Sequence, residues 1–369
     1  MAEERGTDRT QVLVTPEELA AATPPGGHRL IVDATVLLAP PRHDGDYRAE
    51  SGRSAWREAR LPGSLHVDLL TRFTDPAAPF HFAAPGPAAV HRELASLGAG
   101  PATELVVYDA GSMQWATRLW WTLRNAGVAA RVLDGGLARW RRLGLPVESG
   151  DATPARPTAP CPTTADPITA DPITADPITA DPITADPITA RPTTADPITA
   201  DPTAARPTTA GPRLAHADAE ALAVRPPGRH APDAWPERGR DLWADRRLVH
   251  DISLGRRPGT LVCALGREHF EGTAPTRYTR RGRIPRSVSL PARGVLSEHG
   301  DVVPDRLLNA YAAGLPADAT RPVVVYCGGG ISATLAALGL TLAGVEDVRV
   351  YDGSLEEWTA DRTLPVLTG

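Results

Sequence analysis

Cysteine is scarce in this sequence. Only three occur among 369 residues, Cys161, Cys263 and Cys327, and they are widely separated. An odd number at such spacing fits neither a disulfide framework nor a CxxC metal site. We therefore expect free thiols and no bound metal.

Long hydrophobic runs and an excess of positive charge are also missing. No stretch approaches the roughly 18 apolar residues of a membrane span, and the first residues, MAEERGTDRTQVLVTPEEL, lack the basic flank and apolar core of a signal peptide. The net charge of -5 gives no general reason to expect nucleic acid or an anionic membrane as a partner. We expect a cytoplasmic protein.

Proline and glycine, in contrast, are abundant, with 38 and 33 residues. A five-residue repeat runs from Cys161 to Ala210, and the unit DPITA occurs six times in it. Proline in every unit excludes helix and removes strand donors, and the low apolar content cannot offset the entropy of ordering. We predict that residues 151–212 form an extended or disordered linker; a β-solenoid is the ordered alternative.

The two flanks of the repeat resemble each other. Residues 105–147 and 324–366 share an apolar strand, a turn, an apolar helix, a second strand and a closing Leu-Pro-Val. The matching positions include Tyr108 with Tyr326, Asp134 with Asp352, and Trp140 with Trp358. We infer a tandem duplication of one unit, with domains at residues 1–150 and 213–369.

Each copy has the pattern of an α/β fold. Short unbroken runs of valine and leucine alternate with helix-length amphipathic segments, as in a parallel sheet flanked by helices. Residues 28–35 and 258–265 supply the first such strand of each copy, and capped helices are predicted at 15–22 and 216–223.

Cys327 lies where a strand of the second copy leads into a helix, and ligands of parallel sheets bind at such points. The loop residues after it are Gly328, Gly329, Gly330, Ile331 and Ser332. Their backbone N–H groups can turn inward, and the helix start adds a positive dipole end, so the loop can bind an anion and favour a thiolate. We predict that Cys327 is a nucleophile and that Ser332 caps the helix. The alternative, a buried core cysteine, is our interpretation of Cys263.

Two chemistries use a cysteine in such a loop. A cysteine-dependent phosphatase requires an arginine six positions after the nucleophile, where this chain has Ala333. In sulfur transfer, the thiolate attacks a sulfane sulfur and becomes a persulfide, which backbone N–H groups hold until an acceptor takes the sulfur. The sequence favours sulfur transfer.

Three motifs carry a family resemblance. CGGGISA at the loop is similar to CxxGVTA, YDGSLEEW to YDGSWxEW, and VLDGGLARW is the matching stretch of the first half. The chain resembles the two-domain rhodaneses, the thiosulfate and 3-mercaptopyruvate sulfurtransferases, over both flanks but not over the repeat. The resemblance implies two rhodanese-like domains and catalysis in the second domain only. Asp109 stands at the position that matches Cys327, and it cannot carry a persulfide.

The chain also departs from the family. Thiosulfate enzymes usually have basic residues after the cysteine and mercaptopyruvate enzymes have glycine and serine, whereas this chain has Gly328 and Gly329. The family histidine before Ile-Pro is Arg60 in the first half and Arg283 in the second. We name Arg277 and Arg283, in the basic segment RYTRRGRIPR, as candidates for binding an anionic substrate. Residues 224–257 have no counterpart in the family pattern, and we interpret them as an insertion.

These observations predict a sulfurtransferase that moves sulfur from a small donor, thiosulfate or 3-mercaptopyruvate, to a thiol or cyanide acceptor through Cys327. We expect no cofactor, no metal, no nucleic acid or membrane partner, and a monomer. The alternatives are a degenerate rhodanese that acts as a protein sulfur carrier or binding module, and a cysteine phosphatase.

Overall fold

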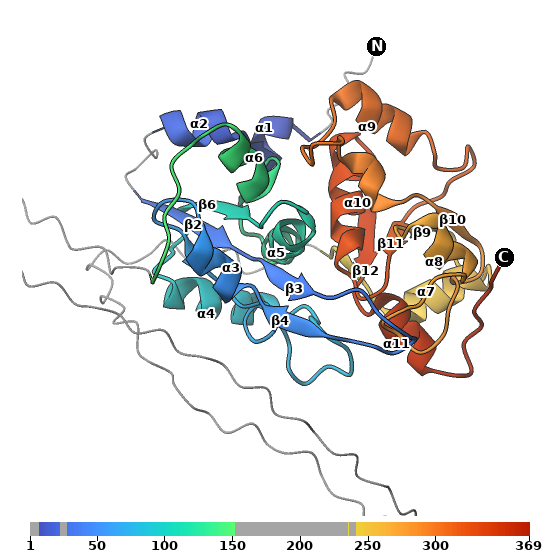
Figure 1. Ribbon diagram of the computed structural model, residues 1–369. Coiled ribbons are helices and arrows are strands. Elements are labelled where there is room, and N and C mark those ends of the chain that lie inside the picture. The colour runs from blue at the N-terminus through green and yellow to red at the C-terminus, as the bar shows by residue number, and fades with distance from the viewer. Residues whose placement is uncertain (1–6, 23–27, 152–234, 236–240) are drawn as a thin grey trace, which may run out of the picture. The chain divides into compact units, whose positions relative to one another are not determined.

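The structure, a computed structural model, describes residues 7–22, 28–151, 235 and 241–369. The repeat, Cys161 and the helix predicted at 216–223 lie outside these residues. The described residues belong to one compact unit, and both five-stranded sheets lie in it (Figure 1).

The first half builds a five-stranded sheet in which all neighbouring strands are parallel. In spatial order the strands are β1 (Leu13–Val14), β7 (Arg131–Leu133), β6 (Glu104–Tyr108), β2 (Arg29–Asp33) and β5 (Leu65–His66). The central strand β6 is buried from Leu105 to Tyr108. Burial on both faces explains its unbroken apolar sequence.

The second half repeats this arrangement. Its parallel strands are, in the matching order, β8 (Trp243–Ala244), β12 (Val348–Tyr351), β11 (Val323–Tyr326), β9 (Thr260–Cys263) and β10 (Ser287–Ser289). The predicted duplication of a parallel α/β unit is therefore confirmed. The strands predicted at 28–35 and 258–265 are β2 and β9.

The interpretation of residues 224–257 as an insertion is wrong for their described part. Residues 241–257 contain β8 and α7 (Arg246–Ser253), and β8 pairs with β12 just as β1 pairs with β7. The correspondence between β8 and β1 was not visible when the two halves of the sequence were aligned, because a two-residue edge strand has almost no hydrophobic pattern of its own.

Helices flank both sheets. In the first half they are α1 (Arg9–Val12), α2 (Pro16–Ala21), α3 (Arg53–Glu58), α4 (Pro87–Ser96), α5 (Gln114–Asn125) and α6 (Gly136–Arg142). The second half adds α8 (Arg267–Glu271), the 3-10 helix η1 (Ala292–Val295), α9 (Asp305–Ala312), α10 (Ser332–Leu342) and α11 (Ser354–Ala360). The helix predicted at 15–22 is α2, whose N-terminus is closed by a capping box between Thr15 and Glu18.

The duplicated tryptophans have the same structural role in both halves. The indole Nε1 of Trp140 donates to the carbonyl of Pro146 at 2.7 Å, and that of Trp358 donates to the carbonyl of Pro365 at 2.9 Å. Each bond ties the helix after the Asp-Gly turn to the closing Leu-Pro-Val.

The helices that follow β6 and β11 join the two halves. α5 and α10 pack against each other, and the hydroxyls of Thr117 and Thr334 lie 3.1 Å apart between them. Every residue of α10 from Ala333 to Leu342 is buried, which accounts for its almost wholly apolar sequence. The buried Trp120 and Trp121 of α5 lie in the same hydrophobic core as the residues of α10.

A hairpin of the first half reaches the second half (Figure 1). Its strands are β3 (Val36–Leu38) and β4 (Ala49–Ser51). In the turn between them, Asp44 accepts from Arg281 Nε at 2.8 Å, and Gly45 N–H donates to the carbonyl of Thr276 at 2.9 Å. These bonds hold the hairpin against the segment that precedes β10.

Candidate active site

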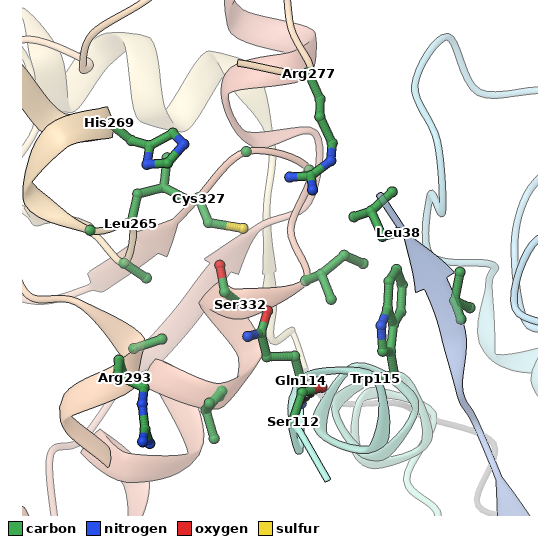
Figure 2. Close-up of a pocket in the computed structure, with 18 of the residues that line it drawn as sticks. Leu38, Ser112, Gln114, Trp115, Leu265, His269, Arg277, Arg293, Cys327 and Ser332 are labelled. Atoms are coloured by element: carbon green, nitrogen blue, oxygen red, sulfur yellow. Dashed lines mark hydrogen bonds between the residues drawn. The ribbon is translucent and has the colours of Figure 1, made fainter. Parts of the chain in front are cut away.

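Cys327 lies immediately after β11, at the carboxyl end of the central strand of the second sheet. The residue is only 2% exposed. Nevertheless it lines a cavity of about 620 Å³, and its sulfur points into that cavity (Figure 2). Residues of both halves form the wall, among them Trp115 of α5 and Leu38 of β3.

The loop after Cys327 is held by the first turn of α11. Cys327 N–H donates to Ser354 Oγ at 3.1 Å, and Glu356 N–H donates to the carbonyl of Gly328 at 2.8 Å. At Gly330 the backbone φ is +73°, and a Cβ there would lie 2.4 Å from the carbonyl oxygen of Asp352. Only glycine fits at this position.

The matching loop of the first half shows what this backbone binds. The carboxylate of Asp109 accepts backbone N–H bonds from Gly111 at 2.8 Å, Met113 at 2.9 Å, Trp115 at 3.0 Å and Ala116 at 3.2 Å. Burial raises the pKa of Asp109 and these N–H groups oppose that rise. Each oxygen accepts two of the four bonds, a geometry that fits the ionised carboxylate. The loop is therefore an anion-binding loop, filled by its own side chain.

In the second half, three of the four matching N–H groups have no hydrogen-bond acceptor among the described residues. The N–H groups at the matching positions Gly329, Ile331 and Ala333 donate to no acceptor within the described part of the chain. The fourth, on Thr334, donates to the carbonyl of Ile331 at 3.1 Å. Backbone donors beside a cysteine can stabilise a negatively charged sulfur adduct.

The prediction that Ser332 caps α10 is wrong. Ser332 is the first residue of the helix, Ile331 occupies the N-cap position, and no side chain makes a capping hydrogen bond there. The hydroxyl of Ser332 lies beside the sulfur of Cys327 at the cavity (Figure 2). Because Ile331 takes the N-cap position, Ser332 lies one residue too far along the chain to cap the helix.

Two arginines, Arg277 and Arg293, place positive charge on the cavity wall, and His269 lines it as well. Arg277 donates from Nε and Nη2 to the carbonyl of Ala39 in the hairpin, at 3.2 and 2.8 Å. Burial, with Arg277 nearby, lowers the pKa of His269, so this imidazole is neutral at pH 7. The two guanidinium groups are the positive charges available to an anionic substrate.

Arg283, the other predicted substrate ligand, does not line this cavity. Its guanidinium lies 4.4 Å from the ring centroid of Phe270 and donates to the carbonyls of Phe270 and Gly369. Arg283 therefore ties the C-terminus to α8, and we withdraw it as a substrate ligand. Sequence proximity to Arg277 could not separate the two.

Two polar groups at the cavity have no hydrogen-bond partner among the described residues. These are the hydroxyl of Tyr278 and the Oε2 atom of Glu356, both buried. The other carboxylate oxygen of Glu356 accepts from the backbone N–H of His81 at 3.2 Å and from its Nδ1. His81 belongs to the first half, so the halves meet at this side chain.

Sequence reasoning missed several wall residues. His269 and Arg293 follow β9 and β10, so the rule that ligands bind at carboxyl ends of parallel strands could have identified them. Trp115 lines the wall from the first half, and His81, also of the first half, bonds to the wall residue Glu356; no local signal joins either residue to Cys327.

Two other kinds of site are absent from the described residues. No group of three or more His, Cys, Asp or Glu side chains there could hold a metal ion. No helix in the described ranges has the length and apolarity needed to cross a membrane.

Comparison with known proteins gives a family. The sequence matches the Rhodanese-like domain family over residues 15–143 and 267–361. It is 25% identical to the "Putative thiosulfate sulfurtransferase SseB" of Mycobacterium tuberculosis over 98% of both chains. It is 27% identical to the human 3-mercaptopyruvate sulfurtransferase, over 85% of this chain and 82% of the human protein.

Solved structures agree in fold. The Tum1 protein of Saccharomyces cerevisiae superimposes with a TM-score of 0.63 at 17% identity, over 97% of this chain and 98% of that one. SseA of Escherichia coli, a 3-mercaptopyruvate sulfurtransferase, gives 0.56 at 20% identity, over 93% of this chain and 98% of that one. Both halves of the chain thus share an architecture with these proteins.

Proposed function

The chain belongs to the rhodanese-like family, and from this premise we propose that it is a sulfurtransferase. It takes a sulfane sulfur from thiosulfate or 3-mercaptopyruvate, carries it as a persulfide on Cys327 and passes it to a thiophilic acceptor. Residues 213–369 form the catalytic domain, residues 1–150 a non-catalytic domain, and residues 151–212 the linker. Two relatives with these donors in their names support the choice of donors.

One observation carries the proposal. The sulfur of Cys327 faces a cavity beside three backbone N–H groups that have no acceptor among the described residues, and in the matching loop of the first half the equivalent groups bind the carboxylate of Asp109. A persulfide is an anion, so the loop offers it the contacts that Asp109 already makes.

The reaction balances without a cofactor. With thiosulfate, the Cys327 thiolate attacks the outer sulfur, the S–S bond breaks, and sulfite leaves with the electron pair. Cyanide then attacks the outer sulfur of the persulfide, and thiocyanate leaves while the thiolate is regenerated. Arg277 and Arg293 attract the anionic donor into the cavity.

The site is less suited to the alternatives. Phosphoryl transfer in such a loop needs a guanidinium on the residue that is Ala333 here, and Ala333 is fully buried. Direct transfer from a protein donor needs an accessible sulfur, whereas that of Cys327 lies in a cavity between the halves. A small donor fits this cavity better.

A thiocyanate assay tests the proposal. The protein, its Cys327→Ser variant and its Cys263→Ala variant are each given thiosulfate or 3-mercaptopyruvate with cyanide. We expect turnover with at least one donor, loss of turnover on substitution of Cys327, and retained turnover in the Cys263 variant, because Cys263 is fully buried in strand β9. A folded protein that turns over neither donor would refute the proposal.

A further inference from the structure

Glu356 has an unusual position for a carboxylate. It lies in the first turn of α11 and lines the cavity with Cys327. Its Oε1 accepts from His81, but its Oε2 is buried and has no partner in the described part of the chain. A Cβ built on Gly329 would lie 3.1 Å from that oxygen. The free oxygen is thus directed at the loop that follows the nucleophile.

His81 connects this carboxylate with solvent. Its side chain is 53% exposed, and its ring stacks on Tyr47 with centroids 3.9 Å apart and planes 7° from parallel. The hydrogen bond from its Nδ1 to Glu356 raises the pKa of His81 against the lowering effect of burial. The pair therefore joins a protonated group at the surface to a buried carboxylate in the cavity wall.

The two donors of the proposed function differ in their need for a proton. Thiosulfate releases sulfite, which leaves as a stable anion and takes up no proton at a carbon. A 3-mercapto-2-oxo acid gives its sulfur by cleavage of the C–S bond, and the electron pair stays on carbon 3 as an enolate. That carbon must gain a proton to become the methyl group of the 2-oxo acid.

We propose that Glu356 passes this proton from His81 to carbon 3, so that the pair makes the site a mercapto acid sulfurtransferase. The Cys327 thiolate attacks the donor sulfur and the C–S bond breaks; as the enolate forms, the proton of the His81 imidazolium moves to the Glu356 carboxylate, and the carboxyl group gives it to carbon 3. Glu356 is then a carboxylate again, and the neutral His81 regains its proton from solvent. The inference rests on the proposed function and assigns its preferred donor.

Other groups in the cavity are poorer proton donors. Burial raises the pKa of Tyr278 well above its ordinary range, so its phenol holds its proton. His269 is neutral at pH 7 because burial and Arg277 lower its pKa. The loop itself has Gly329, which carries no side chain. Glu356 is the acid that also has a path to solvent.

The test compares the two donors in Glu356→Gln, with cyanide as the acceptor because its half-reaction needs no proton. The glutamine oxygen can still accept from His81 but cannot transfer a proton. General acid catalysis contributes about 100-fold or more, so we expect kcat with 3-mercaptopyruvate to fall about 100-fold. We expect kcat with thiosulfate to stay within about twofold, because that step needs no proton.

His81→Asn tests the positioning residue. The substitution removes the group that supplies the proton but leaves Glu356 in place. Turnover of 3-mercaptopyruvate should therefore depend on the concentration of a buffer acid, whereas turnover of thiosulfate should not. Glu357→Gln is the matched control, since Glu357 is the neighbouring acid of α11 and pairs with Arg246 at 3.9 Å outside the cavity. We expect it to leave both activities within about twofold.

The outcomes separate the inference from the proposed function. If Glu356→Gln lowered kcat equally with both donors, the effect would be structural and the inference would be overturned. A Glu356→Gln variant with unchanged kcat for both donors would also overturn it. Turnover of thiosulfate but not of 3-mercaptopyruvate by the unaltered protein would also overturn it and leave the proposed function intact. If the unaltered protein turns over 3-mercaptopyruvate but not thiosulfate, inorganic polysulfide serves as the proton-independent donor in place of thiosulfate. Sulfur transfer is then measured as the mass that one sulfur atom adds to Cys327. If the unaltered protein turns over neither donor, both the inference and the proposed function are refuted.

Discussion

Asp109 and Cys327 occupy the same position in two copies of one loop, each directly after the central strand of its sheet. Asp109 fills its loop with its own carboxylate, which four backbone N–H groups bind. In the loop of Cys327, three of the matching donors have no acceptor in the part of the chain that the structure describes. One copy thus stabilises the fold, while the other can hold a substrate anion.

Removal of the built-in anion should destabilise the first half. Asp109→Ala leaves four buried N–H groups without an acceptor, and we expect a loss of about 3 kcal/mol in the free energy of unfolding, measured with urea. Asp151→Ala is the control, because its carboxylate is 68% exposed and, among the described residues, binds only the surface residue Arg57. A loss no larger than that of the control would contradict the role assigned to Asp109.

The two arginines named from the sequence should behave differently. Arg277→Ala removes a positive charge from the cavity wall, and we expect KM for an anionic donor to rise about tenfold with a smaller change in kcat. Arg283→Ala should leave both constants unchanged, because its guanidinium binds Phe270 and Gly369 outside the cavity.

Arg277 also holds the hairpin, so a further control is needed. Arg281→Ala breaks the ion pair with Asp44 in the same hairpin but removes no charge from the cavity wall. If it raised KM as much as Arg277→Ala does, the effect would belong to the hairpin and not to substrate binding.

The buried ion pair between the halves should be important for stability. Arg118 is 3% exposed; it donates to Asp352 Oδ1 at 2.6 Å, to the carbonyl of Gly330 at 3.3 Å and to that of Phe82. Arg118→Ala leaves these acceptors buried, and we expect a loss of about 4 kcal/mol in the free energy of unfolding. Arg267→Ala removes an exposed helical pair with Glu271 and should cost less than about 0.5 kcal/mol. Similar losses in the two variants would refute this assignment.

Stability should depend on pH through His81. The hydrogen bond to Glu356 raises the pKa of His81 in the folded protein, although burial opposes it. Protonation therefore favours the folded state: the contribution is fully present below the unfolded pKa of about 6.5 and is lost as pH rises through the raised folded pKa. The difference in unfolding free energy between the protein and His81→Asn should shrink as pH rises above about 6.5. In a Glu356→Gln background that pH dependence should disappear; its persistence would assign it to another group.

The sequence determined the features that depend on neighbouring residues. Runs of valine predicted β6 and β11, the capping box at Thr15 predicted α2, and the glycines after Cys327 predicted a backbone that can bind an anion. These signals are local, because strand burial, helix caps and glycine conformations are set within a few positions of the chain. The duplication was visible because both copies retain the same Tyr, Asp-Gly and Trp positions.

Only the tertiary structure decided which side chains meet Cys327. Arg277 lines the cavity, whereas Arg283 binds the carbonyl of Gly369. Ser332 lies in the cavity wall and does not cap α10, and β8 and α7 belong to the second half of the fold. The tertiary structure also joined His81 to Glu356 across 275 positions of sequence. Such contacts depend on how two folded halves pack, and the free energy of that packing is spread over α5, α10 and the hairpin rather than recorded in any one motif.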